Sequence, residues 1–208
     1  MKIQKFKISN FNSSIIFLVI LVFGLLFFYS IPNIHNKHDL QKHLSKEIDK
    51  IYPFDISLSP DITYSILPKP HFKVKNSKIF LKSENGNLEL GEAKETNIYI
   101  SKIGSFDLNK IKVEKINFLD SDLRLDEENF KFLKDIINLS IKKNLQFSKT
   151  RLYFKENKKL DTVINLILLD QINLKYDKDD NSNVLNAKGK LYNQDAIFYW
   201  RKNLSTKN

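Results

Sequence analysis

Few side chains in this sequence could carry out chemistry, and they form no catalytic arrangement. His35, His38 and His43 lie close together and could in principle bind a metal ion. His35, however, precedes the predicted helix that carries the other two, so a solvated surface explains the three imidazoles more simply. No nucleophile, phosphate-loop or metalloprotease motif occurs in the sequence. The sequence therefore predicts a protein that is not an enzyme, with no cofactor.

A cluster of carboxylates is the second candidate for chemistry. Asp120, Asp122, Asp126, Glu127 and Glu128 could bind a hard cation such as Ca²⁺. A turn followed by the N-terminus of a helix explains the same residues, because carboxylates there interact favourably with the helix dipole. No metal site is therefore predicted.

Composition removes further classes of function. The chain has 208 residues and no cysteine, which excludes disulfides, thiolate zinc sites and cysteine nucleophiles. The net charge is +10, yet the lysines are scattered and no RNA-binding pattern of basic and aromatic residues is present. Nucleic acid is not an expected partner.

The most informative pattern is apolar. One spacing of apolar residues occurs three times. It consists of two apolar residues two positions apart, then a step of five positions, then a second pair two positions apart. Because side chains of a strand alternate between faces, a step of five would turn the second pair to the opposite face. A bulge or a small polar turn at Asn76-Ser77, Asp120-Ser121 and Lys149-Thr150 restores the face. The pattern predicts a repeated strand unit, either a kinked long strand or a tight strand pair, with one apolar side; chance in an Ile- and Leu-rich chain is the alternative. The three quartets are Phe72/Val74/Ile79/Leu81, Ile116/Phe118/Leu123/Leu125 and Leu145/Phe147/Leu152/Phe154.

Other elements complete a predicted α+β fold that is mostly β. An amphipathic helix is predicted over 36–52, ended by Pro53, and an inserted helix over 127–142, with Asp126 as its N-cap. Asn85-Gly86 predicts a hairpin turn. Short connections favour antiparallel pairing of neighbouring strands. The expected architecture is a curved antiparallel β-sheet or groove with one inserted helix, preceded by a transmembrane helix and an amphipathic helix.

The N-terminal part resembles a membrane anchor. Residues 15–29 form an unbroken apolar run that follows Lys2, Lys5 and Lys7. A cleaved signal peptide and a buried helix are the alternatives; against the signal peptide, no small-x-small cleavage site follows the run. Lysines flank the span on both sides, so the positive-inside rule barely distinguishes the two orientations. The short basic tail favours an N-terminus in the cytoplasm. We expect a cytoplasmic tail over 1–13, an anchor over 14–32 and a periplasmic domain over 33–208.

This layout resembles the start of AsmA-family envelope proteins. Residues 62–72 read ITYSILPKPHF, similar to an apolar pattern that ends in Pro-x-Pro, and residues 72–76 continue as apolar-x-apolar-x-Asn. Residues 111–118 and 186–192 resemble later strands of the family. The resemblance covers most of residues 1–200 through loose hydrophobic patterns, and this chain is far shorter than usual family members. It implies an inner-membrane, single-pass protein with a periplasmic domain, related to bridge-like lipid-transfer proteins with a repeating β-groove.

Two functions follow as expectations. The first is phospholipid handling in outer-membrane biogenesis, with a phospholipid or another acyl-chain lipid as the ligand of an apolar β-groove. The second is a membrane-anchored scaffold that assists outer-membrane protein assembly through open sheet edges, with envelope assembly proteins as partners. The apolar face could instead pack on the two helices of the protein itself or on a second sheet. The candidate lipid-contacting residues are Phe72, Val74, Ile98, Ile100, Ile111, Val113, Ile116, Phe118, Leu123, Leu125, Phe147, Leu152 and Phe154.

Overall fold

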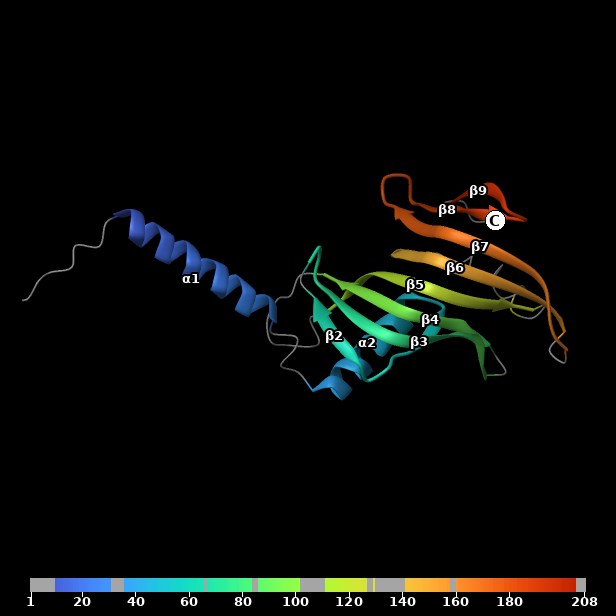
Figure 1. The fold of residues 1–208 in the computed structure, drawn as a ribbon, viewed down its shortest axis with the longest axis horizontal. Helices are drawn as coiled ribbons and strands as arrows, with labels where there is room; N and C mark the ends of the chain where they lie inside the picture. Colours follow the sequence, from blue (N-terminus) through green and yellow to red (C-terminus); the bar gives the residue numbers. More distant parts are fainter. Residues whose placement is uncertain are drawn as a thin grey trace, which may run out of the picture.

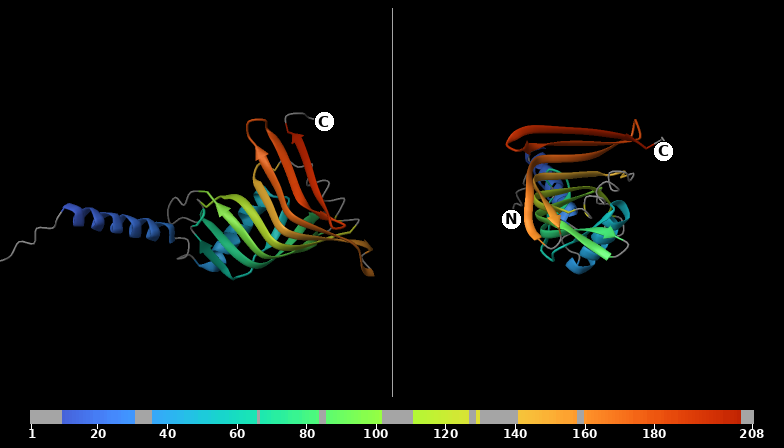
Figure 2. Two further views of the ribbon diagram at one scale, coloured as in Figure 1. Left: turned by 45° about the horizontal axis from the view of Figure 1, so that its top comes forward. Right: turned by 90° about the vertical axis from the view of Figure 1, so that its right-hand side faces the viewer.

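A single curved sheet dominates the computed structural model (Figures 1 and 2). The structure describes residues 10–30, 36–65, 67–83, 86–101, 111–126, 129, 141–157 and 160–204. The sheet order is β1-β3-β4-β5-β6-β7-β8-β9, and β2 also pairs with β3. The fold is therefore mostly β, as predicted. The strands are β1 (Phe54–Ser57), β2 (Ile62–Ser65), β3 (His71–Ser83), β4 (Gly86–Ile100), β5 (Val113–Leu125), β6 (Asn144–Asn157), β7 (Leu160–Asp177), β8 (Ser182–Leu191) and β9 (Gln194–Asn203).

Helix α1 spans Asn10–Ser30 and projects away from the sheet in Figure 1. Its large apolar side chains between Ile15 and Leu25 are exposed. Within the described part of the chain, no helix combines the length and the apolar content that a membrane crossing requires.

Helix α2 spans Lys37–Ile51 and confirms the predicted amphipathic helix. The side chain of Asn36 caps its N-terminus by accepting a hydrogen bond from the backbone N–H of His38 at 3.0 Å. Leu40, Leu44 and Ile48 form its buried face, at the helical spacing of four. Tyr52 follows the helix and donates its hydroxyl to the backbone carbonyl of Asn144 at 2.8 Å, which ties the helix end to β6. Burial raises the pKa of Tyr52 above its ordinary value.

The three apolar quartets lie on one face of the sheet, as the bulge hypothesis predicts. Each quartet belongs to one long strand that is kinked at a left-handed residue: Asn76 (φ 50°) in β3, Asp120 (φ 51°) in β5 and Lys149 (φ 54°) in β6. The extra residue adds one position to the alternation, so the apolar pairs on both sides of the kink face the same way. Of the two proposed units, the kinked long strand is correct and the tight strand pair is wrong.

The kink crosses the sheet at one level. The flanking registers place Asn76, Lys94, Asp120, Lys149 and Asp170 opposite one another on β3 to β7. Because each of these strands carries the extra residue at the same level, the ladders keep their register through the kink. At the level of the kink the register shifts between β7 and β8, next to Leu169. The other register shifts lie away from this level, at Ile79/Phe80, at Tyr99/Ile100 and between Phe154 and Asn157. The kink is therefore a property of the whole sheet from β3 to β7.

The prediction that strands adjacent in the sequence pair antiparallel is wrong at two places: β1 pairs with β3 rather than with β2, and the pairing of β5 with β6 is not antiparallel. β5 and β6 are parallel, with Ile116 opposite Leu145 and Phe118 opposite Phe147. Two parallel neighbours need a crossover connection that returns the chain to the starting end, and the long segment between β5 and β6 provides it. The prediction failed because it treated this connection as short, although an inserted helix was expected within it.

Most of the inserted helix predicted over 127–142 falls outside the described residues. Asn129 is helical, and its backbone N–H donates to the side chain of Asp126 at 2.8 Å, which agrees with Asp126 as the N-cap. The predicted end is wrong, because Ile141 and Lys142 belong to no helix. The hairpin predicted at Asn85-Gly86 is confirmed by the pairing of Ser83 with Gly86, although Asn85 itself lies outside the described residues.

The left-handed kink residues give a first testable prediction. Replacing Lys149 by valine should lower the free energy of unfolding by about 1–2 kcal/mol, because a β-branched residue tolerates positive φ poorly. Replacing Lys149 by glycine should leave the free energy of unfolding nearly unchanged. Urea denaturation measures both. Lys188→Val, at an exposed position of β8, is the matched control; an equal loss in this control would contradict the prediction.

Candidate functional site

The candidate site is the face of the sheet that carries the quartets and contacts α2, here called the inner face. Ten of the thirteen predicted lipid-contacting residues are buried there, with exposed fractions of 0–6%. They pack in one core with Leu40, Leu44 and Ile48 of α2. The part of the inner face formed by β3, β4 and β5 is therefore covered by the protein's own side chains. This agrees with the alternative interpretation, in which the apolar face packs on the protein itself. The ten residues are Phe72, Val74, Ile98, Ile100, Ile111, Val113, Ile116, Phe118, Leu123 and Leu125.

The other three predicted residues lie at the border of this core. Phe147, Leu152 and Phe154 of β6 are half-buried and pack against it. The ring of Phe147 stacks on that of Phe118 with centroids 4.8 Å apart. β6 is thus the strand at which the filled part of the inner face gives way to a more accessible part.

The accessible part continues over β7, β8 and β9, which the predicted site did not include. Directly opposite residues of paired strands point to the same face, so the register extends each inner row. Phe147 is opposite Ile172, Ile172 is opposite Ala187, and Ala187 is opposite Phe198. The strand patterns at Leu160–Tyr176 and the aromatic residues 198–200 carried the signal for this extension, but only the register assigns them a face.

Exposure rises steadily along this row from the core to the edge. Phe118 is fully buried, Phe147, Ile172 and Ala187 are half-buried, and Phe198 is 55% exposed. A parallel row runs from buried Leu145 through half-buried Leu174 and Leu185 to half-buried Trp200. An apolar surface that is continuous with the core therefore reaches the solvent over the last strands.

A polar line crosses the filled part of the inner face beside the kink. Ser77, Ser121 and Thr150 lie between the two apolar pairs of their quartets and are buried. The hydroxyls of Ser77 and Thr96 are 2.5 Å apart, which indicates a hydrogen bond. The hydroxyls of Ser121 and Thr150, on neighbouring strands, have no hydrogen-bond partner among the residues that the structure describes. These uncharged groups offer hydrogen bonds but no acid or base.

The predicted acidic cluster lies in part on the opposite, outer face, where it forms ion pairs. Arg151 contacts both Asp122 and Asp120, and Lys94 donates to Asp120 at 2.5 Å. The hydrogen bond from Lys94, together with the charge of Arg151, holds the pKa of Asp120 below its ordinary value. The hydrogen bond to Asp122 raises the pKa of Arg151. These carboxylates therefore have cationic side chains as partners, while Glu127 and Glu128 lie outside the described residues.

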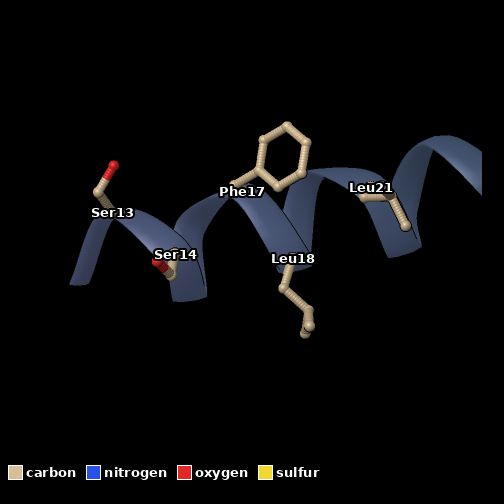
Figure 3. A pocket seen from close by; sticks show the side chains of 5 residues that line it. All are labelled: Ser13, Ser14, Phe17, Leu18 and Leu21. Carbon is tan, nitrogen blue, oxygen red and sulfur yellow. The ribbon is translucent and has the colours of Figure 1, made fainter. Parts of the chain in front are cut away.

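One hollow on the described surface lies far from the inner face and offers no second candidate site. Figure 3 shows this hollow, lined by side chains of α1. All of its lining residues come from this one helix, so no second element closes over it. The lining residues are Ser13, Ser14, Phe17, Leu18 and Leu21.

Comparisons with known proteins add no relative. No protein-family model matches the sequence, and no curated protein matches it either. The resemblance to the AsmA family therefore stays a prediction from the sequence.

Proposed function

We propose that this protein handles lipids by sheltering their acyl chains on the accessible half of the inner face. The observation that carries the proposal is the apolar row that rises from buried Phe118 to exposed Phe198 without a charged residue. The ligand surface is thus moved from the predicted residues of β3–β5 to β6–β9. A phospholipid of the bacterial envelope, as the sequence resemblance implies, is the proposed ligand class.

The chemistry of this surface suits a chain of methylenes. Sheltering a methylene from water contributes about 0.8 kcal/mol, so several methylenes bind without any charged group. A neighbouring row adds Leu174, Leu185 and Trp200, which widens the apolar strip. Trp200 lies at the end of this strip, and its indole N–H is a donor for the polar part of a lipid.

We also propose that the apolar sequence segment expected to be an anchor, residues 14–32, holds the protein at the inner membrane, with the β-domain in the periplasm. The unbroken apolar sequence from Ile15 to Tyr29 supports this proposal, and so does the exposure of the large apolar side chains between Ile15 and Leu25. Fractionation of cells, followed by protease treatment of spheroplasts, tests it. A β-domain that is protected in spheroplasts would contradict the proposed orientation.

The lipid proposal is tested with a matched pair of substitutions on one strand. Ile172→Glu puts a carboxylate into the accessible inner row, whereas Leu168→Glu puts it on the outer face, where Leu168 is 41% exposed and opposite Arg151. The full chain is purified in a mild detergent, and copurified lipid is measured by mass spectrometry. We expect Ile172→Glu to lower the bound lipid several-fold, because a charge opposes acyl contact.

The Leu168→Glu control distinguishes lipid bound by the sheet from lipid bound by the anchor. Lipid retained by α1 is common to both variants, so only lipid bound at the sheet distinguishes them. Circular dichroism and a melting curve establish that both variants are folded. If folded Ile172→Glu retains as much lipid as Leu168→Glu and the unmodified chain, the apolar face binds no lipid and the proposal is wrong.

A further inference from the structure

β9 is an edge strand with apolar side chains on both of its faces. Among the described strands it pairs with β8 alone. Ile197 is 80% exposed and Tyr199 59% exposed on the outer face, and Phe198 is 55% exposed on the inner face. Edge strands usually carry charges, prolines or bulges that prevent pairing with another chain. The central residues of β9, 196–200, carry none of these.

The sequence of β9 is complementary to itself in one antiparallel register. When Phe198 faces Phe198 of a second copy, Ile197 faces Tyr199 and Ala196 faces Trp200. All five apolar positions then meet apolar positions, and cross-strand pairs of aromatic and aliphatic residues stabilise sheets. At both ends of this segment the carboxylate of Asp195 faces the cationic Arg201.

Other registers lose this match. A shift by two residues places Ile197 opposite Arg201 or Tyr199 opposite Asp195. A parallel pairing brings Arg201 and Lys202 close to the same residues of the other copy, and like charges destabilise such contacts. The Phe198-centred register also joins inner face to inner face, because directly opposite residues point the same way.

We propose that a second copy of this chain pairs with β9, antiparallel and centred on Phe198, to form a two-fold symmetric dimer with one continuous sheet. The same surface is used on both subunits, as two-fold symmetry requires. The backbone groups of residues 196–200 that point away from β8 become hydrogen-bonded to the second copy, and the exposed rings meet across the junction. The inference does not depend on lipid binding, although the dimer would join two accessible inner faces.

Disulfide trapping tests the register, since the chain has no cysteine of its own. Opposite Cα atoms of antiparallel strands lie about 4.5–5.5 Å apart, within the range that a disulfide spans. Phe198→Cys should therefore form a disulfide-linked dimer of the full chain in membranes under mild oxidation. A mixture of differently tagged Ile197→Cys and Tyr199→Cys chains should form the mixed dimer, whereas Ile197→Cys alone places its thiols on diagonal positions roughly 7–8 Å apart.

Leu168→Cys is the control for random collision, because Leu168 is exposed on the outer face of β7, away from the edge. We expect roughly tenfold more dimer for Phe198→Cys than for this control, since a stable contact raises the local thiol concentration. The proposal is overturned if Phe198→Cys and Leu168→Cys give equal amounts of dimer. It is also overturned if Ile197→Cys alone links as well as the mixture, or if Phe198→Cys links only to a different protein.

Discussion

Phe118→Ala should lower the free energy of unfolding by about 4 kcal/mol, within the range for truncating a buried phenylalanine. Phe118 is fully buried, stacks on Phe147 and lies with its centroid 6.1 Å from that of Phe54 of β1. The substitution leaves a cavity where β1, β5 and β6 meet, which the surrounding rings cannot close. Urea denaturation of the full chain in detergent, at low protein concentration, measures the loss.

The control for Phe118 comes from the same inner row. Phe198→Ala removes the same atoms from a side chain that is 55% exposed, so it should cost less than about 1 kcal/mol. The difference between the two losses of free energy of unfolding shows whether the packed core extends along the row as far as Phe198. Equal losses would mean that the end of the row is as tightly packed as its start, and the proposed accessible face would be absent.

Gly91→Val should be the second large effect, with a loss of about 3 kcal/mol, because overpacking between two strands forces the backbones apart. A Cβ atom on Gly91 would overlap the backbone carbonyl of Asp122 and would lie 2.9 Å from the Cα atom of Leu123. β4 and β5 would have to separate at the centre of the sheet. The melting temperature of the purified chain reports the change.

Glu92→Val is the neighbouring control for this strand. Glu92 is exposed and lies opposite Asp122 on β5 and opposite Lys78 on β3, so its replacement removes one like-charged and one oppositely charged neighbour, whose effects offset each other. We expect a melting temperature that is unchanged. A comparable drop in both variants would indicate that β4 tolerates no change of side chain. It would contradict the explanation that the close contact between Gly91 and the backbone of β5 causes the loss.

Local patterns predicted the elements with clear physical signatures. The spacing of Leu40, Leu44 and Ile48 identified α2, and the odd step within each quartet identified the kinks at Asn76, Asp120 and Lys149. Both signals depend on side-chain periodicity, which a single sequence displays directly. Predicting that the twelve quartet residues share a face required nothing more than this periodicity and the assumption of a bulge.

Long-range features were not accessible in the same way. The parallel pairing of β5 and β6 depends on the path of a connecting segment, and no local pattern specifies that path. The sequence does not distinguish core residues from ligand-contacting residues for a related reason: an apolar strand residue such as Val74 or Ile116 looks the same whether α2 or a ligand covers it. Only the order of strands and the position of α2 separate the filled half from the accessible half.

The aligned kinks have an evolutionary consequence. Each strand from β4 to β8 pairs only with its two neighbours, and the kink passes from β3 to β7 at one level. A duplicated strand pair with the same kink could be inserted among them, or lost, without rearrangement of the remaining ladders. The width of such a sheet can therefore change by whole hairpins over generations, while the chain order and the packing around α2 persist.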